Sequence, residues 1–283
     1  MVLFGIAVAE GASTILGAVS VYGLIRFFVR RKKDDSDVNW TPLEAIGVTI
    51  FIYFATQVIV ALGAGLIGSQ AGLNDDQLNA TLNNSPGWQF LFILVTEILT
   101  AWLLYTFIVK VRMTSLKAIG VVKPKLRDIG YALAGFGAYF AIYGLVVFNL
   151  FQHLFPQVDT NQRQDLGFGS GVSGPALLFV FFSLVVLPPL VEELLVRGFL
   201  YTGLRTKLPI IYAAIVTSLV FASAHLQWGN GKPLLWTAAA DTFTLSMVLI
   251  YLRQKTGSLW PGIGVHFIKN SIAFAVLFVF HVS

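Results

Sequence analysis

The sequence predicts an all-α, polytopic membrane protein with about eight transmembrane helices. Hydrophobic residues make up 56% of the 283 residues and charged residues only 12%, whereas soluble domains are ~45–50% apolar. The apolar residues are gathered into eight stretches, each close to the ~20 residues that a helix needs to cross a bilayer. The basic residues fall between these stretches on alternate connections, which is typical of membrane helices.

The expected spans, in order, are roughly residues 3–25, 42–68, 88–109, 129–152, 175–196, 209–226, 233–252 and 260–281. The first is not expected to be a cleaved signal peptide, because it lacks a basic start, carries Glu10 and is followed by the basic run at 30–33. We expect it to anchor the chain with its N-terminus outside. Trp40, Trp88 and Trp260 lie at predicted span ends, where indole rings anchor at the membrane interface.

The basic residues predict the orientation of the helices. Of the 19 lysines and arginines, 16 fall in the four connections that alternation places in the cytoplasm, at 26–33, 110–127, 197–207 and 253–255. The positive-inside rule therefore predicts that both termini lie outside. These residues orient the helices and are not expected to bind nucleic acid. The chain has no cysteine, which excludes disulfides, thiolate metal sites and a cysteine nucleophile.

One apolar stretch, LPPLVEELLVRGFLYTGLR, carries two adjacent carboxylates and a guanidinium. An unpaired charge inside a membrane span costs at least ~2–3 kcal/mol, so such charges usually have a partner or a function. If the stretch is helical, Glu193 and Arg197 are four residues apart on one face and can form an ion pair. Glu192 points elsewhere and has no local partner. Pro188 and Pro189 are expected to break the helix and so turn Glu192 towards a cavity.

Further polar groups lie in later spans. Phe221 and His225 are four residues apart and should share a helical face, as should His266 and Asn270. The membrane interior supplies no hydrogen-bond partners to polar groups. Three separate spans carry such groups: a carboxylate, a histidine, and a histidine with an amide. We therefore expect these groups to converge on one polar site.

Such a site would suit peptide hydrolysis without a covalent intermediate. A carboxylate and an imidazole that hold one water molecule between them form a general base. A second histidine with an amide can stabilise the oxyanion of a tetrahedral intermediate. Two histidines and one glutamate are equally plausible as zinc ligands with an open fourth position. The residues alone do not distinguish these two chemistries.

The order and spacing of three motifs resemble those of the CPBP family of intramembrane proteases, which contains CAAX prenyl endopeptidases and Abi-like bacteriocin-processing enzymes. The motifs are EExxxR at 192–197, FxxxH at 221–225 and HxxxN at 266–270. The resemblance covers about residues 175–275, which we expect to be the catalytic core of a single membrane domain over 1–283, with accessory helices in 1–170. It implies an active site sunk below the membrane surface.

The resemblance also implies roles for these residues. Glu192 would activate water together with His225, while His266 and Asn270 would stabilise the oxyanion. Glu193, Arg197 and Phe221 would support the site. A metal-free glutamate mechanism is favoured and no cofactor is expected. The alternative is a zinc-dependent protease with Glu192, His225 and His266 as ligands. The expected substrate is a peptide or membrane protein, processed as in CAAX or bacterial peptide maturation.

The sequence contains further intramembrane carboxylates and a serine motif. Glu10 is expected to be structural or interfacial, whereas Glu97 and Asp241 could partner Lys269 or a histidine, and none of the three is placed in the catalytic set. The sequence GVSG around Ser173 matches the serine motif of rhomboid-type proteases, but four residues in a loop match easily by chance. A non-catalytic membrane scaffold or immunity protein of the same fold is the main alternative function.

The expected location is a bacterial or archaeal plasma membrane, with the lipid bilayer as a partner and the active-site cavity open to the cytoplasm. The oligomeric state is left open. One feature conflicts with this arrangement, because a straight span from Pro209 would carry His225 towards the outer face. Either this helix tilts strongly, or the segment WGNGKP at 228–233 enters the protein as a re-entrant loop.

Overall fold

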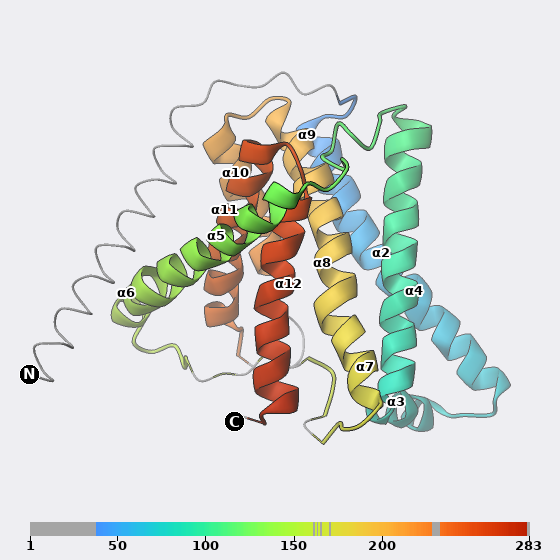
Figure 1. The fold of residues 1–283 in the computed structure, drawn as a ribbon. Helices are drawn as coiled ribbons and strands as arrows, with labels where there is room; N and C mark the ends of the chain where they lie inside the picture. Colours follow the sequence, from blue (N-terminus) through green and yellow to red (C-terminus); the bar gives the residue numbers. More distant parts are fainter. Residues whose placement is uncertain are drawn as a thin grey trace, which may run out of the picture. The chain divides into compact units, whose positions relative to one another are not determined.

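The structure, a computed structural model, describes residues 38–160, 162, 164, 166–169, 171–227 and 233–281 (Figure 1). Its regular elements are all helical, and no strand occurs within these ranges. The prediction of an all-α, polytopic membrane protein is therefore confirmed. The predicted first span at 3–25, with Glu10, lies outside the described residues, as does most of the segment at 228–233.

Within the described ranges, five helices are long and apolar enough to cross a membrane. They are Pro42–Gln70, Pro86–Val111, Leu126–Leu154, Ala176–Arg205 and Trp260–Val279, and they correspond to five of the predicted spans. Helix α10, Ile210–Ser223, is apolar but has only 14 residues. Helix α11, Trp236–Thr256, has 21 residues, carries Asp241 and ends with Arg253 and Lys255 in its last turn. The total of eight spans and the outside position of both termini remain predictions.

The helices form two compact units. The first unit holds the described parts of 122–164 and 204–265. Its elements are α5 Leu126–Ile142, η2 Tyr143–Val147, α6 Phe148–Leu154, α10, α11 and the first turns of α12, Trp260–Phe274. Tyr139 and Ile142 of α5 pack in one buried core with Leu245 and Leu249 of α11. Gly135 allows this close packing, because a Cβ there would lie 2.7 Å from Leu252 Cδ1.

The second unit holds the described parts of 37–121, 165–203 and 266–283. Its elements are α2 Pro42–Gln70, α3 Asp75–Asn84, α4 Pro86–Tyr105, η1 Thr106–Val111, the helical run from Ala176, the end of α12 and η5 Ala275–Val279. Helix α2 begins with a capping box, in which the Thr41 side chain accepts from the Glu44 backbone N–H and Glu44 accepts from the Thr41 N–H. In Figure 1, α3 joins α2 and α4 at one end.

The run that carries Glu192 is continuous from Ala176 to Arg205. It consists of α7 Ala176–Phe181, η3 Phe182–Val186, α8 Leu187–Glu192, η4 Glu193–Leu200 and α9 Tyr201–Arg205, where η3 and η4 are π-helical. The prediction that Pro188 and Pro189 break the helix is therefore wrong. Both prolines lie just after the junction between η3 and α8. The wider π turn before them accommodates the carbonyls that a proline leaves without an α-helical donor.

Candidate active site

Glu192, the last residue of α8, borders a cavity of about 220 Å³ within the second unit. The cavity lies among α2, α4 and the Glu192 run, and several of its lining side chains are polar: Tyr53, Thr56, Gln57, Thr96, Glu97 and Thr100. Two of these polar groups bond to each other across the helices, since the Thr100 hydroxyl donates to Thr56 Oγ1 at 3.2 Å. Glu192 therefore borders a cavity without a helix break, and His225, His266 and Asn270 are not among the residues that line this cavity.

The carboxylate of Glu192 has one oxygen ready for a further partner. Oε2 is buried and forms no hydrogen bond with any described residue. It lies 3.8 Å from Nε2 of His266, which is too long for a direct hydrogen bond. A polar separation of this size often contains a bridging water molecule. Glu192 and His266 can therefore hold water between them.

His266 is buried and lies between two carboxylates. Its Nε2 faces Glu192, and its Nδ1 lies 3.5 Å from Oε1 of Glu193. Arg197 Nη1 donates to the same Glu193 oxygen at 2.8 Å, and both side chains of this pair are almost completely buried. The predicted ion pair is thus confirmed. Glu193 therefore neutralises Arg197 and also lies close to the imidazole of His266.

Asn270 links α12 to the run that carries Glu192. Its Nδ2 donates to the backbone oxygen of Leu184 at 2.8 Å. Leu184 belongs to the π-helical segment η3, where widened turns leave carbonyls accessible to other donors. An amide nitrogen carries two hydrogens, so Asn270 retains a second donor after this bond. Asn270 is one helical turn after His266, as the sequence predicted.

His225 belongs to the first unit and lies just beyond the end of α10. This helix ends at Ser223, earlier than the expected span over 209–226. The predicted pairing with Phe221 is confirmed, since the two rings lie 4.9 Å apart and His225 Nδ1 is 3.0 Å from the Phe221 backbone oxygen. A carbonyl only accepts, so Nδ1 must donate. In the neutral ring Nε2 then carries the lone pair, which is the form that a general base requires. Convergence of His225 with Glu192 remains a prediction.

Two intramembrane carboxylates outside the predicted catalytic set have different surroundings. Glu97 of α4 borders the same cavity as Glu192, which the sequence could not show because these residues are 95 positions apart (192 − 97). Asp241 of α11 accepts a short hydrogen bond from the Tyr139 hydroxyl. This bond joins α11 to α5 and gives Asp241 a structural role. Gln57, also in the cavity, was detectable in the sequence only as an amide inside an apolar span.

Zinc binding by Glu192, His225 and His266 stays a prediction. A catalytic zinc site usually has three protein ligands. Of the three predicted ligands, Glu192 and His266 lie in one unit and His225 in the other. Among the residues that the structure describes, no three His, Cys, Asp or Glu side chains are grouped so that they could hold a metal ion.

Ser173 is exposed in the segment just before α7. It is not among the residues that line the Glu192 cavity. Its surroundings therefore give no support to a serine protease of the rhomboid type.

Comparison with known proteins supports the resemblance found in the sequence. Residues 174–272 match the model of a family described as Type II CAAX prenyl endopeptidase Rce1-like. The matched stretch contains all three motifs and is consistent with the CPBP family. At the family level it supports a CAAX-type protease in a membrane. Neither the curated proteins nor the solved structures contain a match to the chain.

Proposed function

We propose that this protein is an intramembrane endopeptidase that hydrolyses a peptide bond with a water molecule activated by Glu192 and His225. The position of Glu192 carries the proposal. Its carboxylate has a buried oxygen that accepts no hydrogen bond from described residues, borders a polar cavity and lies beside His266. An ionisable side chain at such a place in a membrane span usually marks a functional site. The surrounding residues match a protease family.

The proposed reaction needs only water and the peptide. Glu192 takes one proton from the water molecule, and the resulting hydroxide attacks the carbonyl carbon of the scissile peptide. The tetrahedral intermediate then collapses, the C–N bond breaks, and Glu192 gives its proton to the leaving nitrogen. A lone pair on His225 Nε2 would accept the second hydrogen bond of the water and align it for attack. A cavity of about 220 Å³ has room for this water, since one water molecule occupies ~30 Å³.

His266 and Asn270 are proposed to stabilise the oxyanion. This role uses a hydrogen on His266 Nε2, the ring nitrogen that faces Glu192. The bond from Asn270 to Leu184 fixes the amide and leaves its second N–H for the substrate. Donors that are already oriented stabilise the developing charge without having to reorganise during the reaction. The proposed substrate is a peptide or membrane protein of the CAAX or bacterial-processing type.

The test is cleavage of a peptide panel by the purified full-length chain. The panel contains CAAX peptides with and without an isoprenoid, together with unmodified membrane peptides, and products are identified by mass spectrometry. Glu192→Gln and His225→Ala should each lower the rate by about 10²–10⁴-fold, the usual range for loss of general acid–base catalysis. Ser173→Ala is the matched control and should cleave at the wild-type rate. Thermal unfolding in detergent shows that each variant is folded.

Two outcomes would decide against the proposal. If folded Glu192→Gln cleaves as fast as the wild type, Glu192 is not the base. If no peptide is cleaved and both variants retain biological function, the chain is a scaffold or an immunity protein. Repeating the assay with chelator-treated protein, followed by metal analysis, distinguishes the metal-free mechanism from the zinc-dependent one.

A further inference from the structure

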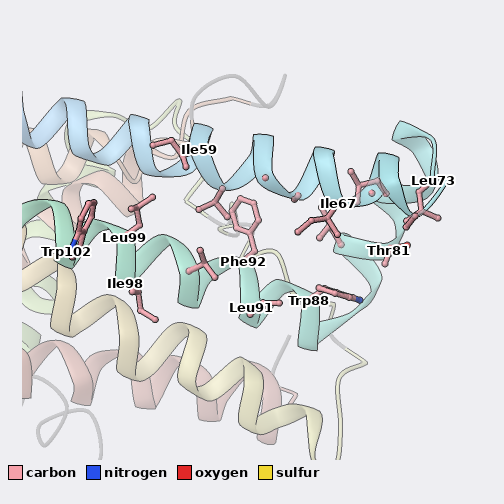
Figure 2. A pocket seen from close by; sticks show the side chains of 18 residues that line it. Ile59, Ile67, Leu73, Thr81, Trp88, Leu91, Phe92, Ile98, Leu99 and Trp102 are labelled. Atoms are coloured by element: carbon pink, nitrogen blue, oxygen red, sulfur yellow. The ribbon is translucent and has the colours of Figure 1, made fainter.

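A second, larger cavity lies in the same unit, in the groove between α2 and α4 (Figure 2). Its volume is about 620 Å³, and none of its lining residues carries a charged side chain. The groove is open at its side, since Ile67 of α2 and Ile98 of α4 are 65% and 59% exposed. Both helices are long and apolar enough to span a membrane. The groove therefore runs along the hydrocarbon region of the bilayer.

Helix α3 closes one end of this groove. Leu78 and Leu82, four residues apart on α3, line the groove, while the described polar side chains of the helix are mostly exposed. Gly68 of α2 permits the contact, because a Cβ there would lie 3.0 Å from the methyl carbons of Leu78. A short helix with one apolar edge and an exposed polar surface is typical of the membrane interface. The α3 end of the groove therefore lies at the membrane surface.

Trp88 supports this assignment. It lines the groove near α3, and its indole nitrogen is visible at that end in Figure 2. Tryptophan is enriched where hydrocarbon meets the headgroup layer, because its ring is apolar and its N–H is polar. The groove thus has a polar end at α3 and an apolar body that extends towards Trp102. This is the polarity of a phospholipid inserted from that surface.

The volume limits what can bind. A spanning helix is ~30 Å long and at least ~10 Å wide, which corresponds to a volume on the order of 2,000 Å³. The groove is several times smaller, and its 620 Å³ falls in the range of ~300–1,000 Å³ typical of small-molecule sites. A single hydrocarbon chain fits this space, whereas a helix of a second protein does not.

We propose that the groove between α2 and α4 binds one acyl chain of a bilayer phospholipid, with its headgroup beside α3. Because the lining contains neither lysine nor arginine, binding depends on the chain and not on the charge of the headgroup. Phe92 lines both this groove and the Glu192 cavity. The bound chain therefore contacts a side chain that also borders the candidate active site. The lipid site does not depend on the proposed protease activity.

The test uses fluorescence quenching of the full-length chain in detergent micelles. Phosphatidylcholine with brominated oleoyl chains is added at increasing mole fraction, and the unbrominated lipid is the reference. Bromine quenches tryptophan on contact, and both Trp88 and Trp102 line the groove. A specific site gives quenching that saturates at low mole fraction, whereas lipid in the surrounding shell gives quenching that rises in proportion to mole fraction.

A matched pair of variants identifies the site. Gly63 lines the groove, and a Cβ at this position meets no atom within 4 Å. Gly63→Leu therefore places a side chain in the groove and should abolish the saturable component of the quenching. Gly47→Leu makes the same change on the same helix, also in open space but outside the groove, and should retain it. Because neither change clashes with the fold, both variants should unfold at the wild-type temperature. The mole fraction that gives half-maximal quenching should be the same for brominated phosphatidylglycerol as for brominated phosphatidylcholine.

Four results would overturn the proposal. One is quenching that only rises in proportion to mole fraction. Another is a saturable component of equal size in both variants. The third is a dimer in the wild type that dissociates on Gly63→Leu, which would show that a second copy occupies the groove. A strong preference for phosphatidylglycerol would contradict recognition through the acyl chain alone.

Discussion

Two glutamates border the same small cavity, but their neighbours differ. Glu192 Oε2 lies 3.8 Å from His266 Nε2, and Glu193 Oε1 lies 3.5 Å from the other ring nitrogen of this histidine. Glu97 belongs to α4 and lines the same cavity, and no histidine is among the residues that line this cavity. Of these two glutamates, only Glu192 therefore lies beside a histidine of the predicted site. Glu97 is better placed to shape the cavity than to carry out the reaction.

This difference predicts unequal effects of the same substitution. Glu192→Gln should lower the cleavage rate by about 10²–10⁴-fold. Glu97→Gln keeps the size and polarity of the side chain, so the cleavage rate should fall by less than about 10-fold, which corresponds to ~1.4 kcal/mol. The measurement is the rate on one peptide at saturating concentration, with thermal unfolding as the control for folding. Equal losses in the two variants would place both carboxylates in the catalytic machinery.

The buried pair of Glu193 and Arg197 makes a second prediction at the residue scale. Removing one member leaves the other as an uncompensated buried charge, which costs about 3–5 kcal/mol. Arg197→Met should therefore lower the thermal unfolding temperature in detergent markedly. The double variant Glu193→Leu with Arg197→Met removes both charges and should recover much of the loss. If the single variant is as stable as the wild type, the pair does not stabilise the unit.

The sequence predicted the chemistry of these residues better than their geometry. The spacing of Glu193 and Arg197 was sufficient to predict their ion pair, because a separation of four residues brings side chains together on a helix. It could not show that Glu193 also reaches His266, which is 73 positions away (266 − 193). Long-range contacts of this kind depend on how the helices pack, and hydropathy does not encode packing.

At the scale of elements, spans were predicted well and irregular turns were not. The predicted start of the second span, residue 42, is the first residue of α2. The same hydropathy gave no sign of the π-helical turns η3 and η4 on either side of α8. A proline was expected to break the helix, yet one wider turn accommodates it without an interruption. Only the tertiary structure determines which of these two outcomes occurs.

Helix α9 packs against the start of α2 at a glycine, which gives a prediction at this scale. A Cβ on Gly203 would lie 2.5 Å from Ala45 Cβ and would also clash with the Trp40 ring. Trp40 is itself stacked on Phe199, with 4.9 Å between ring centroids, so it cannot easily move away. Gly203→Val should therefore destabilise the protein by about 1–3 kcal/mol, as overpacking of a core usually does.

Gly47→Val is the control for this prediction. It makes the same change on α2, where a Cβ meets nothing within 4 Å. Its unfolding temperature should stay close to that of the wild type. If both variants lose the same stability, the effect arises from valine in a helix and not from the contact between α9 and α2.

At the scale of the whole molecule, the distribution of charge predicts which side of the membrane each connection faces. Helix α4 and its extension η1 run from Pro86 to Val111 and are long and apolar enough to cross a membrane. The connections at their two ends must then lie on opposite sides. The connection after Val111 is rich in lysine and arginine, whereas α3 contains neither. The positive-inside rule places the basic connection in the cytoplasm and α3 outside.

The absence of native cysteine makes this orientation directly measurable. Asn84→Cys at the end of α3 and Ser115→Cys in the basic connection each introduce one thiol at an exposed position. A maleimide that cannot cross membranes should label Asn84→Cys in intact cells and Ser115→Cys only after permeabilisation. The reverse labelling pattern would show that the chain has the opposite orientation. Because α3 closes the groove between α2 and α4, the expected pattern would also place the bound phospholipid in the outer leaflet.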